Sequence, residues 1–339
     1  MSALSQVKTL ESQRFWKAFV QRPEFITLML ILVFSLVVGI INPNFLSIKT
    51  VTDTLRASLT TGIFALGVLL VLAAGGIDVS FTAIAIFALY STTRLTLAVY
   101  PDAPYILMVV IALGMGLMMG LLNGYLVYRF KVPSLIVTIG TQYMFSGFLK
   151  AFIGSRHIMD IPKGLDSAGT STLIQASTSD GARVSISIQV LVLILAIVVT
   201  WFILNRTLMG RAVYAVGGSI PIAERLGFNV SSVILFVFGY AGLLAGLGGM
   251  LHGALNRQAN PSDLVGTELN VIAAVVLGGA RITGGTGTVL GTMLGVILIE
   301  LLTNNLILMG VPSTWQKVVI GAIILVASAA FARRGKTLS

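Results

Sequence analysis

Residues 57–93 read ASLTTGIFALGVLLVLAAGGIDVSFTAIAIFALYSTT, and Asp78 is the only charged residue among them. A helix needs about 20 mainly apolar residues to cross a bilayer, so this stretch is long enough for two crossing helices. The glycine pair Gly75-Gly76 lies between the two halves. The stretch therefore predicts two membrane spans that are separated by a break.

The composition of the whole chain is that of a membrane protein. Of its 339 residues, 56% are hydrophobic and 10% are charged, whereas soluble domains carry about 25% charged residues. So apolar a chain cannot cover a water-facing surface, and lipid is its expected solvent. The chain has no cysteine, which excludes disulfides and thiolate metal sites. Its two histidines, His157 and His252, are too few for a multi-histidine metal cluster.

Apolar runs along the chain predict an all-α bundle of about ten transmembrane helices, some of them short, broken or rich in glycine. The expected spans are residues 25–41, 57–77, 79–93, 103–128, 132–149, 184–205, 230–251, 269–281, 286–308 and 315–332. They form one transmembrane domain over residues 24–332, between an N-terminal segment at 1–23 and a tail at 333–339. The N-terminal segment does not have the pattern of a cleavable signal, so we expect the first span to remain as an anchor.

Basic residues between the spans predict the orientation, because lysine and arginine concentrate on the cytoplasmic side. The net charge is +10, and we attribute it to lipid contacts rather than to nucleic acid. Both termini and the loop at about 206–229 are then expected in the cytoplasm, and the loop at about 155–186 is the largest outer loop. Four basic residues fall on the outer side and conflict with this pattern: Lys49, Arg56, Arg94 and Arg257.

Glycine-rich breaks at two places are typical of a transporter. GGIDVS at 75–80 and GGARITGGTG at 278–287 follow the similar apolar runs VLAA and AVVL. Glycine-interrupted segments at matching positions point to a transporter built from repeats. Glycines four residues apart also predict close helix packing. These pairs are Gly116 and Gly120, Gly242 and Gly246, and Gly291 and Gly295.

Polar residues inside apolar runs are candidates for a solute pathway. A carboxylate at membrane depth costs roughly 2.5–3.5 kcal/mol on insertion scales. Asp78 therefore either orders the break between two helices or lines the pathway, or else it caps the following helix at a cytoplasmic helix end. Glu268 either begins a helix, where the dipole favours an acid, or faces the pathway. Glu300 either binds solute hydroxyls or packs between spans. The candidate pathway residues are Asp78, Ser80, Glu268, Asn270, Glu300 and Asn304.

The segment at 206–229 predicts a short amphipathic helix. Ser219 is a suitable N-cap, Pro221 suits a first turn, and Gly227 can end the helix. Ile222 and Leu226 are four residues apart and share one face. A helix this short has marginal stability alone in water. Its apolar face therefore needs a partner, either a cytoplasmic subunit or the membrane surface. The candidate docking residues are Gly210, Arg211, Gly217, Gly218, Ala223, Glu224, Leu226 and Gly227.

Catalytic and nucleotide-binding motifs are absent from the sequence. GKT at 335–337 resembles the end of a phosphate loop, but Ala330 stands where the first glycine is needed and no strand precedes it. No triad or carboxylate pair stands out as catalytic. We therefore expect a transport subunit that is not an enzyme and that holds no cofactor or metal of its own.

Four motifs resemble the permeases of ribose-type sugar importers in the bacterial ATP-binding-cassette superfamily, and the resemblance covers almost the whole chain. Three of them are GGIDVS at 75–80, VPSLIVTIGT at 132–141 and GTELNVIAAVVLGGARITGGTG at 266–287. The fourth, at 210–218, is Gly-Arg-Ala-Val-Tyr-Ala-Val-Gly-Gly. Three departures accompany them. Phe81-Thr82 replaces the usual small residue and glycine, Ala280-Arg281 replaces a small polar pair, and Ser219-Ile220 replaces an asparagine and a charged residue.

The resemblance implies a permease that moves a small sugar across the bacterial inner membrane. A periplasmic binding protein would deliver the sugar, and two permease chains, identical or sister, would form the pathway. Cytoplasmic ATPase subunits, which hold ATP and magnesium, would dock around residues 217–227. Other interpretations remain open. The solute could be a nucleoside, a sugar-like signalling molecule or a branched-chain amino acid, or the chain could be a stand-alone secondary transporter that couples an ion through Asp78.

Overall fold

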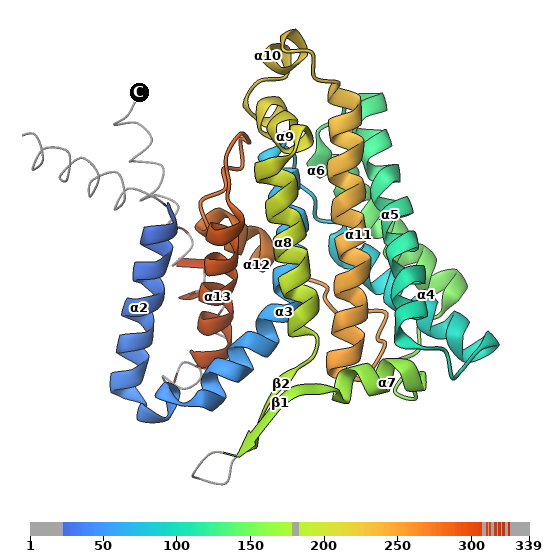
Figure 1. Ribbon diagram of the computed structural model, residues 1–339. Coiled ribbons are helices and arrows are strands. Elements are labelled where there is room, and N and C mark those ends of the chain that lie inside the picture. Colours follow the sequence, from blue (N-terminus) through green and yellow to red (C-terminus); the bar gives the residue numbers. More distant parts are fainter. Residues whose placement is uncertain are drawn as a thin grey trace, which may run out of the picture.

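The computed structural model describes residues 23–177 and 183–306, with scattered positions between 310 and 325. Most of the expected segment at 1–23, much of the expected span at 315–332 and the tail at 333–339 lie outside these residues. Helices make up most of the described chain (Figure 1). In chain order the elements are α2 (Pro23–Ile41), the 3-10 helix η1 (Pro43–Leu46), α3 (Ile48–Ala73), α4 (Phe81–Val99), α5 (Tyr105–Phe130), α6 (Ser134–Phe148), the π-helix η2 (Leu149–Ile153), α7 (Lys163–Thr170), β1 (Thr172–Ser177), β2 (Arg183–Ser187), α8 (Val190–Arg206), α9 (Leu208–Gly218), α10 (Ile220–Arg225), α11 (Val230–Asn256), α12 (Glu268–Leu277) and α13 (Val289–Asn305).

Among the described residues, fewer helices can cross a membrane than the sequence predicts for that part of the chain. In the described residues, six helices are long and apolar enough to cross a membrane, namely α2, α3, α4, α5, α6 together with η2, and α11. The pair α8 and α9, bent by 72° at its break, makes a seventh if it counts as one span. The expected span at 269–281 is wrong as a crossing helix, because the 10 residues of α12 extend only about 15 Å at 1.5 Å per residue.

Both glycine breaks end a helix in the same way. At the end of α3, the Gly75 N–H donates to Leu72 O and the Gly76 N–H donates to Val71 O, both at 2.9 Å. At the end of α12, Gly279 donates to Val276 O at 2.9 Å and Ala280 to Val275 O at 3.2 Å. These are Schellman motifs, and each needs a residue with positive φ. Gly75 and Gly279 supply it, with φ of 83° and 98°.

The long helix α11 lies at the centre of the packing and contacts α3, α4, α5 and α7. It meets α5 through the glycines that the sequence marked for close packing. A Cβ on Gly116 would collide with Gly242 O, and a Cβ on Gly242 would collide with Gly116 O. The prediction that these glycines let helices approach closely is therefore confirmed. The equivalent pair on α13, Gly291 and Gly295, lies against the backbone of α12 in the same manner.

The predicted outer loop at 155–186 contains regular structure that the sequence did not reveal. It holds α7 and a two-stranded antiparallel hairpin in which Thr172 pairs with Ser187 and Ala176 with Val184. An isolated bridge also joins Ile158 to Ala259, after α11. The fold is thus nearly all helical, and α7 and the hairpin lie at the end opposite α10 (Figure 1).

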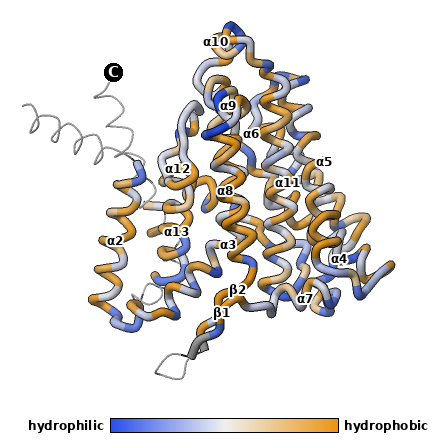
Figure 2. The backbone as a smooth tube through the Cα atoms, viewed as in Figure 1, coloured by the Kyte–Doolittle hydropathy of each residue, from blue (hydrophilic) through white to orange (hydrophobic). Residues whose placement is uncertain are grey.

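The surface of the bundle has the polarity of a membrane protein. Hydrophobic residues cover the lengths of the helices, and hydrophilic ones gather around α9 and α10 at one end and α7 at the other (Figure 2). Most of α3 is buried, whereas most residues of α2, α5 and α6 are not buried inside the bundle. Large apolar side chains such as Leu36, Ile40, Met118 and Tyr143 are among those exposed. Lipid is the solvent that such a surface requires.

Candidate functional site

The helix α10 projects beyond the rest of the bundle, at its extreme end (Figure 1). Ser219 is its N-cap residue with extended backbone, but its side chain makes no capping hydrogen bond. Gly227, with φ of 84°, follows the helix. Its N–H donates to Glu224 O at 2.9 Å, and Phe228 donates to Ala223 O at 3.1 Å. The predicted helix and its glycine end are confirmed, and Ser219 acts through its backbone alone.

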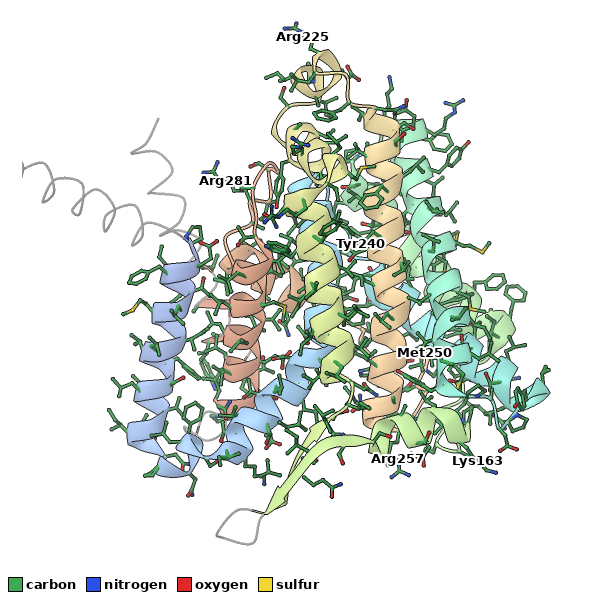
Figure 3. All side chains as sticks on the ribbon, viewed as in Figure 1. Lys163, Arg225, Tyr240, Met250, Arg257 and Arg281 are labelled. Carbon is green, nitrogen blue, oxygen red and sulfur yellow. The ribbon has the colours of Figure 1, made fainter. Side chains whose placement is uncertain are left out.

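The exposed face of α10 is apolar. Ile220, Ile222 and Leu226 are 49%, 57% and 65% exposed, whereas Ala223 is fully buried. Ala223 therefore holds the helix against the bundle and cannot itself touch a partner. Glu224 is exposed, and Arg225 points away from the bundle (Figure 3). An apolar face with charged neighbours, outside the membrane-crossing helices, is suited to contact with another protein.

Directly beside α10, three segments from distant parts of the sequence meet through their backbones. Gly217, at the end of α9, lies against Ala73 O and Gly285 N. The Gly285 N–H itself donates to Ala73 O at 2.9 Å, and Gly284 lies against Gly75 and Gly217 O. We call this contact the glycine junction. It joins the helix pair α9–α10 to both glycine breaks.

Two further interactions fix α9 in place. The Tyr214 hydroxyl donates to Gly287 O at 2.8 Å, which ties α9 to the second break. Gly210 lies against the carbonyls of Ile203 and Leu204 at the bend after α8, and its N–H donates to the Thr207 hydroxyl at 3.1 Å. Of the remaining candidate docking residues, Arg211 is exposed and Gly218 has no atom near the place of a Cβ.

The first break carries a buried polar network. Asp78 is 2% exposed, and its Oδ1 accepts hydrogen bonds from both the N–H and the hydroxyl of Ser80, each at 2.7 Å. Asn123 on α5 donates to the Ser80 hydroxyl at 2.7 Å. Ser80, not Asp78, is the N-cap residue of α4. Asp78 thus orders the break itself, and Asn123 anchors the break to α5.

The second acid, Glu268, begins α12 as expected, but it is also buried, with 7% exposed. Its Oε1 accepts hydrogen bonds from Thr82 at 2.6 Å and from Gln142 at 2.8 Å. Glu268 therefore ties α12 to α4 and α6. The structure brings Asp78 and Ser80 together and leaves Glu268 in this separate network.

A polar pocket of about 420 Å³ lies among α3, α11, α12 and α13. Asn270 and Glu300, two of the predicted pathway residues, line it. Thr61 donates to Glu300 Oε1 at 2.6 Å, and Asn304, also predicted, donates to Glu300 Oε2 at 3.2 Å. Asp78, Ser80 and Glu268 are not part of the pocket wall.

Three charged or titratable wall residues escaped the sequence reasoning: Asp53, Arg56 and His252. The expected span began at residue 57, whereas α3 begins at Ile48 and so places Asp53 and Arg56 within the helix. Their spacing of three residues, which puts both on one face, was the available signal. Arg56 Nη2 donates to Leu255 O at 2.8 Å.

His252 is linked to the loop that precedes α12. Its Nε2 lies 2.9 Å from Asp263 Oδ2, and this hydrogen bond lowers the pKa of Asp263 below its usual value. Among the described residues, no three His, Cys, Asp or Glu side chains gather where they could hold a metal ion. The pocket instead offers hydroxyl, amide, guanidinium and carboxylate groups, which are the partners that a hydroxylated solute needs. Its volume is in the range of about 300–1,000 Å³ that is usual for small-molecule sites.

Comparison with known proteins gives consistent matches along the chain. Residues 50–328 match the family described as the permease component of the branched-chain amino acid transport system. The chain is 31% identical to the ribose import permease protein of Haemophilus influenzae, over 91% of this chain and 92% of that protein. It is 33% identical to the ribose import permease protein of Bacillus subtilis, over 86% and 87% of the two chains. It is 30% identical to the autoinducer 2 import system permease protein of Yersinia pseudotuberculosis, over 88% and 81%. No solved structure matches the chain significantly.

Proposed function

The chain belongs to the family of permease components of the branched-chain amino acid transport system, and from this premise we propose that it imports a small sugar as the membrane subunit of an ATP-binding-cassette transporter. Its described helices make it a multi-pass membrane protein. Relatives that it matches over most of their length are named as import permeases for ribose and autoinducer 2. Both names support a small, hydroxylated solute over an amino acid.

The glycine junction is the observation that carries the proposal. The exposed helix α10 offers an apolar face to a soluble partner, and the junction connects the preceding helix α9 to the end of α3 and to the second glycine break after α12. We propose that the partner is a cytoplasmic ATPase subunit, which holds ATP and magnesium while this chain holds neither. Docking on α10 would then place the α10 end in the cytoplasm of a bacterial cell, the side on which we also propose both termini from the basic residues between the spans.

The polar pocket supports the sugar assignment. It lies toward the end opposite α10, because its wall includes the first turns of α3 and the last turns of α11. In the proposed orientation this is the outer half of the membrane. A periplasmic binding protein would release the sugar there, and a second permease chain, identical or sister, would complete the pathway. The carboxylate of Glu300 and the amide of Asn270 would hydrogen-bond sugar hydroxyls in passing.

Reconstitution tests this proposal. Proteoliposomes that contain the chain and its ATPase, with ATP inside and the sugar-binding protein outside, are expected to accumulate radiolabelled ribose. Uptake should require both ATP and the binding protein. Glu300→Leu should lower uptake, because it removes the acceptor for Thr61 and Asn304 from the pocket wall. Glu24→Leu is the control, since Glu24 hydrogen-bonds Thr288 outside the pocket.

Other outcomes would contradict the proposal in distinguishable ways. Uptake that needs no ATP and stops when the proton gradient collapses would identify a secondary transporter. ATP-dependent uptake of leucine or a nucleoside, with none of ribose, would keep the importer and overturn the sugar. Equal uptake by the Glu300→Leu and Glu24→Leu variants would remove the pocket from the pathway.

A further inference from the structure

A second cavity, apolar and separate from the polar pocket, opens on the membrane-facing side of the bundle. This groove of about 660 Å³ runs between α8 on one side and α5 and α11 on the other. Side chains such as Ile106, Leu195, Val199 and Leu247 form its wall. The hydroxyls of Thr200 and Tyr240 share a hydrogen bond of 2.8 Å between α8 and α11, and Tyr240 lies at mid-height of the bundle (Figure 3).

Apart from Tyr240, the polar side chains of the groove wall gather where the groove meets α7. Ser167 and Ser171 line it there, together with Gln189 and Tyr105. The Gln189 side chain is 1% exposed, and its Nε2 donates to Ala168 O at 3.3 Å. Its Oε1 and the Tyr105 hydroxyl have no hydrogen-bond partner among the described residues. A buried polar atom without a partner costs about 1–3 kcal/mol, so a ligand in this groove that supplies a partner to both atoms would be stabilised there.

The walls and the polar end specify different parts of that ligand. Because α5 and α11 are membrane-crossing helices, the molecules beside the groove are lipids, and an acyl chain would restore the dispersion contacts that an empty groove lacks. The polar end needs a hydrogen-bond donor, since Gln189 Oε1 can only accept. A phospholipid combines both parts in one molecule.

The charges near α7 indicate which headgroup fits. Lys163 pairs with Asp102 at 2.8 Å, and Arg257 pairs with Asp166 at 2.6 Å. Both cations lie at the α7 end of the molecule (Figure 3). None of these four residues lines the groove, and each cation is already paired with a carboxylate, so neither is free to bind an anionic headgroup. A zwitterionic headgroup with a donor, which means ethanolamine rather than choline, matches these paired charges and the unpartnered acceptor.

We propose that this groove is a binding site for phosphatidylethanolamine. One acyl chain lies along α8, α5 and α11, and the ammonium group supplies the donor that Gln189 and Tyr105 lack. The lipid fills the space between α8 and α11 and stabilises their relative position. This site is independent of the sugar pathway and needs only that the chain is embedded in a membrane.

Lipid retention tests the acyl-chain part of the proposal. The chain is purified in mild detergent, and the bound phospholipid is quantified by mass spectrometry. Val199→Trp fills the groove, whereas Val198→Trp places the same side chain at the neighbouring exposed position outside the groove wall. We expect wild type and Val198→Trp to retain phosphatidylethanolamine and Val199→Trp to lose it. Equal retention by the two variants, or no phospholipid in the wild type, would overturn the proposal; the latter is also the result expected if a second permease chain covers the groove.

Thermal unfolding in nanodiscs tests the headgroup. Addition of phosphatidylethanolamine to phosphatidylcholine discs should raise the unfolding temperature, and addition of phosphatidylglycerol should not. Gln189→Leu, which removes the acceptor, should abolish the difference. Gln175→Leu is the control, because Gln175 is exposed on β1, away from the groove wall. An equal rise with phosphatidylglycerol, or an unchanged ethanolamine effect in Gln189→Leu, would refute the headgroup assignment.

Discussion

Gly217 is the residue at which α9 meets the two glycine breaks. Its α-carbon lies so close to Ala73 O and Gly285 N that any Cβ would overlap with both. The next residue, Gly218, has open space in the corresponding direction. A side chain therefore fits at Gly218 but not at Gly217, and the difference is caused by the backbone contact at Gly217.

Alanine substitutions at these two positions distinguish the effect of breaking the junction from the effect of replacing a glycine within a helix. Gly217→Ala is expected to force the junction apart, with a loss of about 1–3 kcal/mol in stability, as for other overpacked sites. ATP-driven uptake should fall with it. Gly218→Ala should leave the stability unchanged, because a Cβ there meets no atom. Thermal unfolding in detergent and uptake in proteoliposomes measure the two effects, and a fully active Gly217→Ala would show that the contact is dispensable.

At this scale the sequence predicted local interactions better than distant ones. The hydrogen bonds from Ser80 to Asp78 span two residues, so a capping pattern could anticipate them. Asn123 reaches the same hydroxyl from another helix. No local pattern specifies that contact, because it depends on how α5 packs. The roles of Asp78, Glu268 and Glu300 in solute passage remain predictions.

Among the elements, α5 and α11 pack closely because glycines at their contact have no side chain. Gly116 faces the backbone of Gly242, whereas Gly114, two residues earlier on α5, has nothing near the place of a Cβ. Gly116→Ala should separate the helices and lower stability by about 1–3 kcal/mol. Gly114→Ala should be neutral or slightly stabilising, since alanine favours helix. Unfolding temperatures of the two variants make the comparison, and equal temperatures would contradict it.

For the helix α10 we predict an effect on partner binding instead of stability, because its apolar face is exposed. Leu226→Asp places a carboxylate in the proposed ATPase contact, where burial without a partner is costly. We expect the variant to fold normally and to lose both ATPase co-purification and transport. Leu173→Asp, at an exposed position on β1 at the opposite end, should keep both. Normal co-purification and transport by Leu226→Asp would exclude α10 as the docking helix.

The sequence predicted long helices well and short elements poorly. The apolar runs behind α3, α5 and α11 are long enough to require a crossing helix. The run behind α12 is shorter, and hydropathy does not distinguish a helix that crosses from one that enters and turns back. The hairpin β1–β2 and α7 were missed because polar residues dominated the pattern of their segment.

For the whole molecule, the dominant feature is the apolar surface that α2, α5 and α6 leave uncovered. In water this surface would drive association, because contiguous apolar patches of more than a few hundred Å² are rare on soluble monomers. The purified chain should therefore be monodisperse in detergent or nanodiscs and aggregate when detergent is removed. Size-exclusion chromatography with light scattering measures this, and a soluble, monodisperse chain without detergent would refute the membrane assignment.

The amino-acid composition alone predicts that the chain lies in a membrane. It does not predict which sequence motifs contact one another in the folded chain. The motifs at 75–80, 210–218 and 278–287 are each visible in the sequence, but their meeting depends on how α3, α9 and α12 pack. Likewise, the polar pocket combines residues from α3 and α13 that lie more than 200 positions apart, as the hydrogen bond from Thr61 to Glu300 shows.

The glycine junction has a mechanical consequence. Where side chains separate two helices, rotamer changes can absorb a small displacement of one helix before the backbone of the other helix moves. At the glycine junction the backbones are in direct contact, so no side chain is available to absorb a displacement. A displacement of α9, transmitted from α10, would therefore act at once on the end of α3 and on the second glycine break, and the two breaks would move together instead of one after the other.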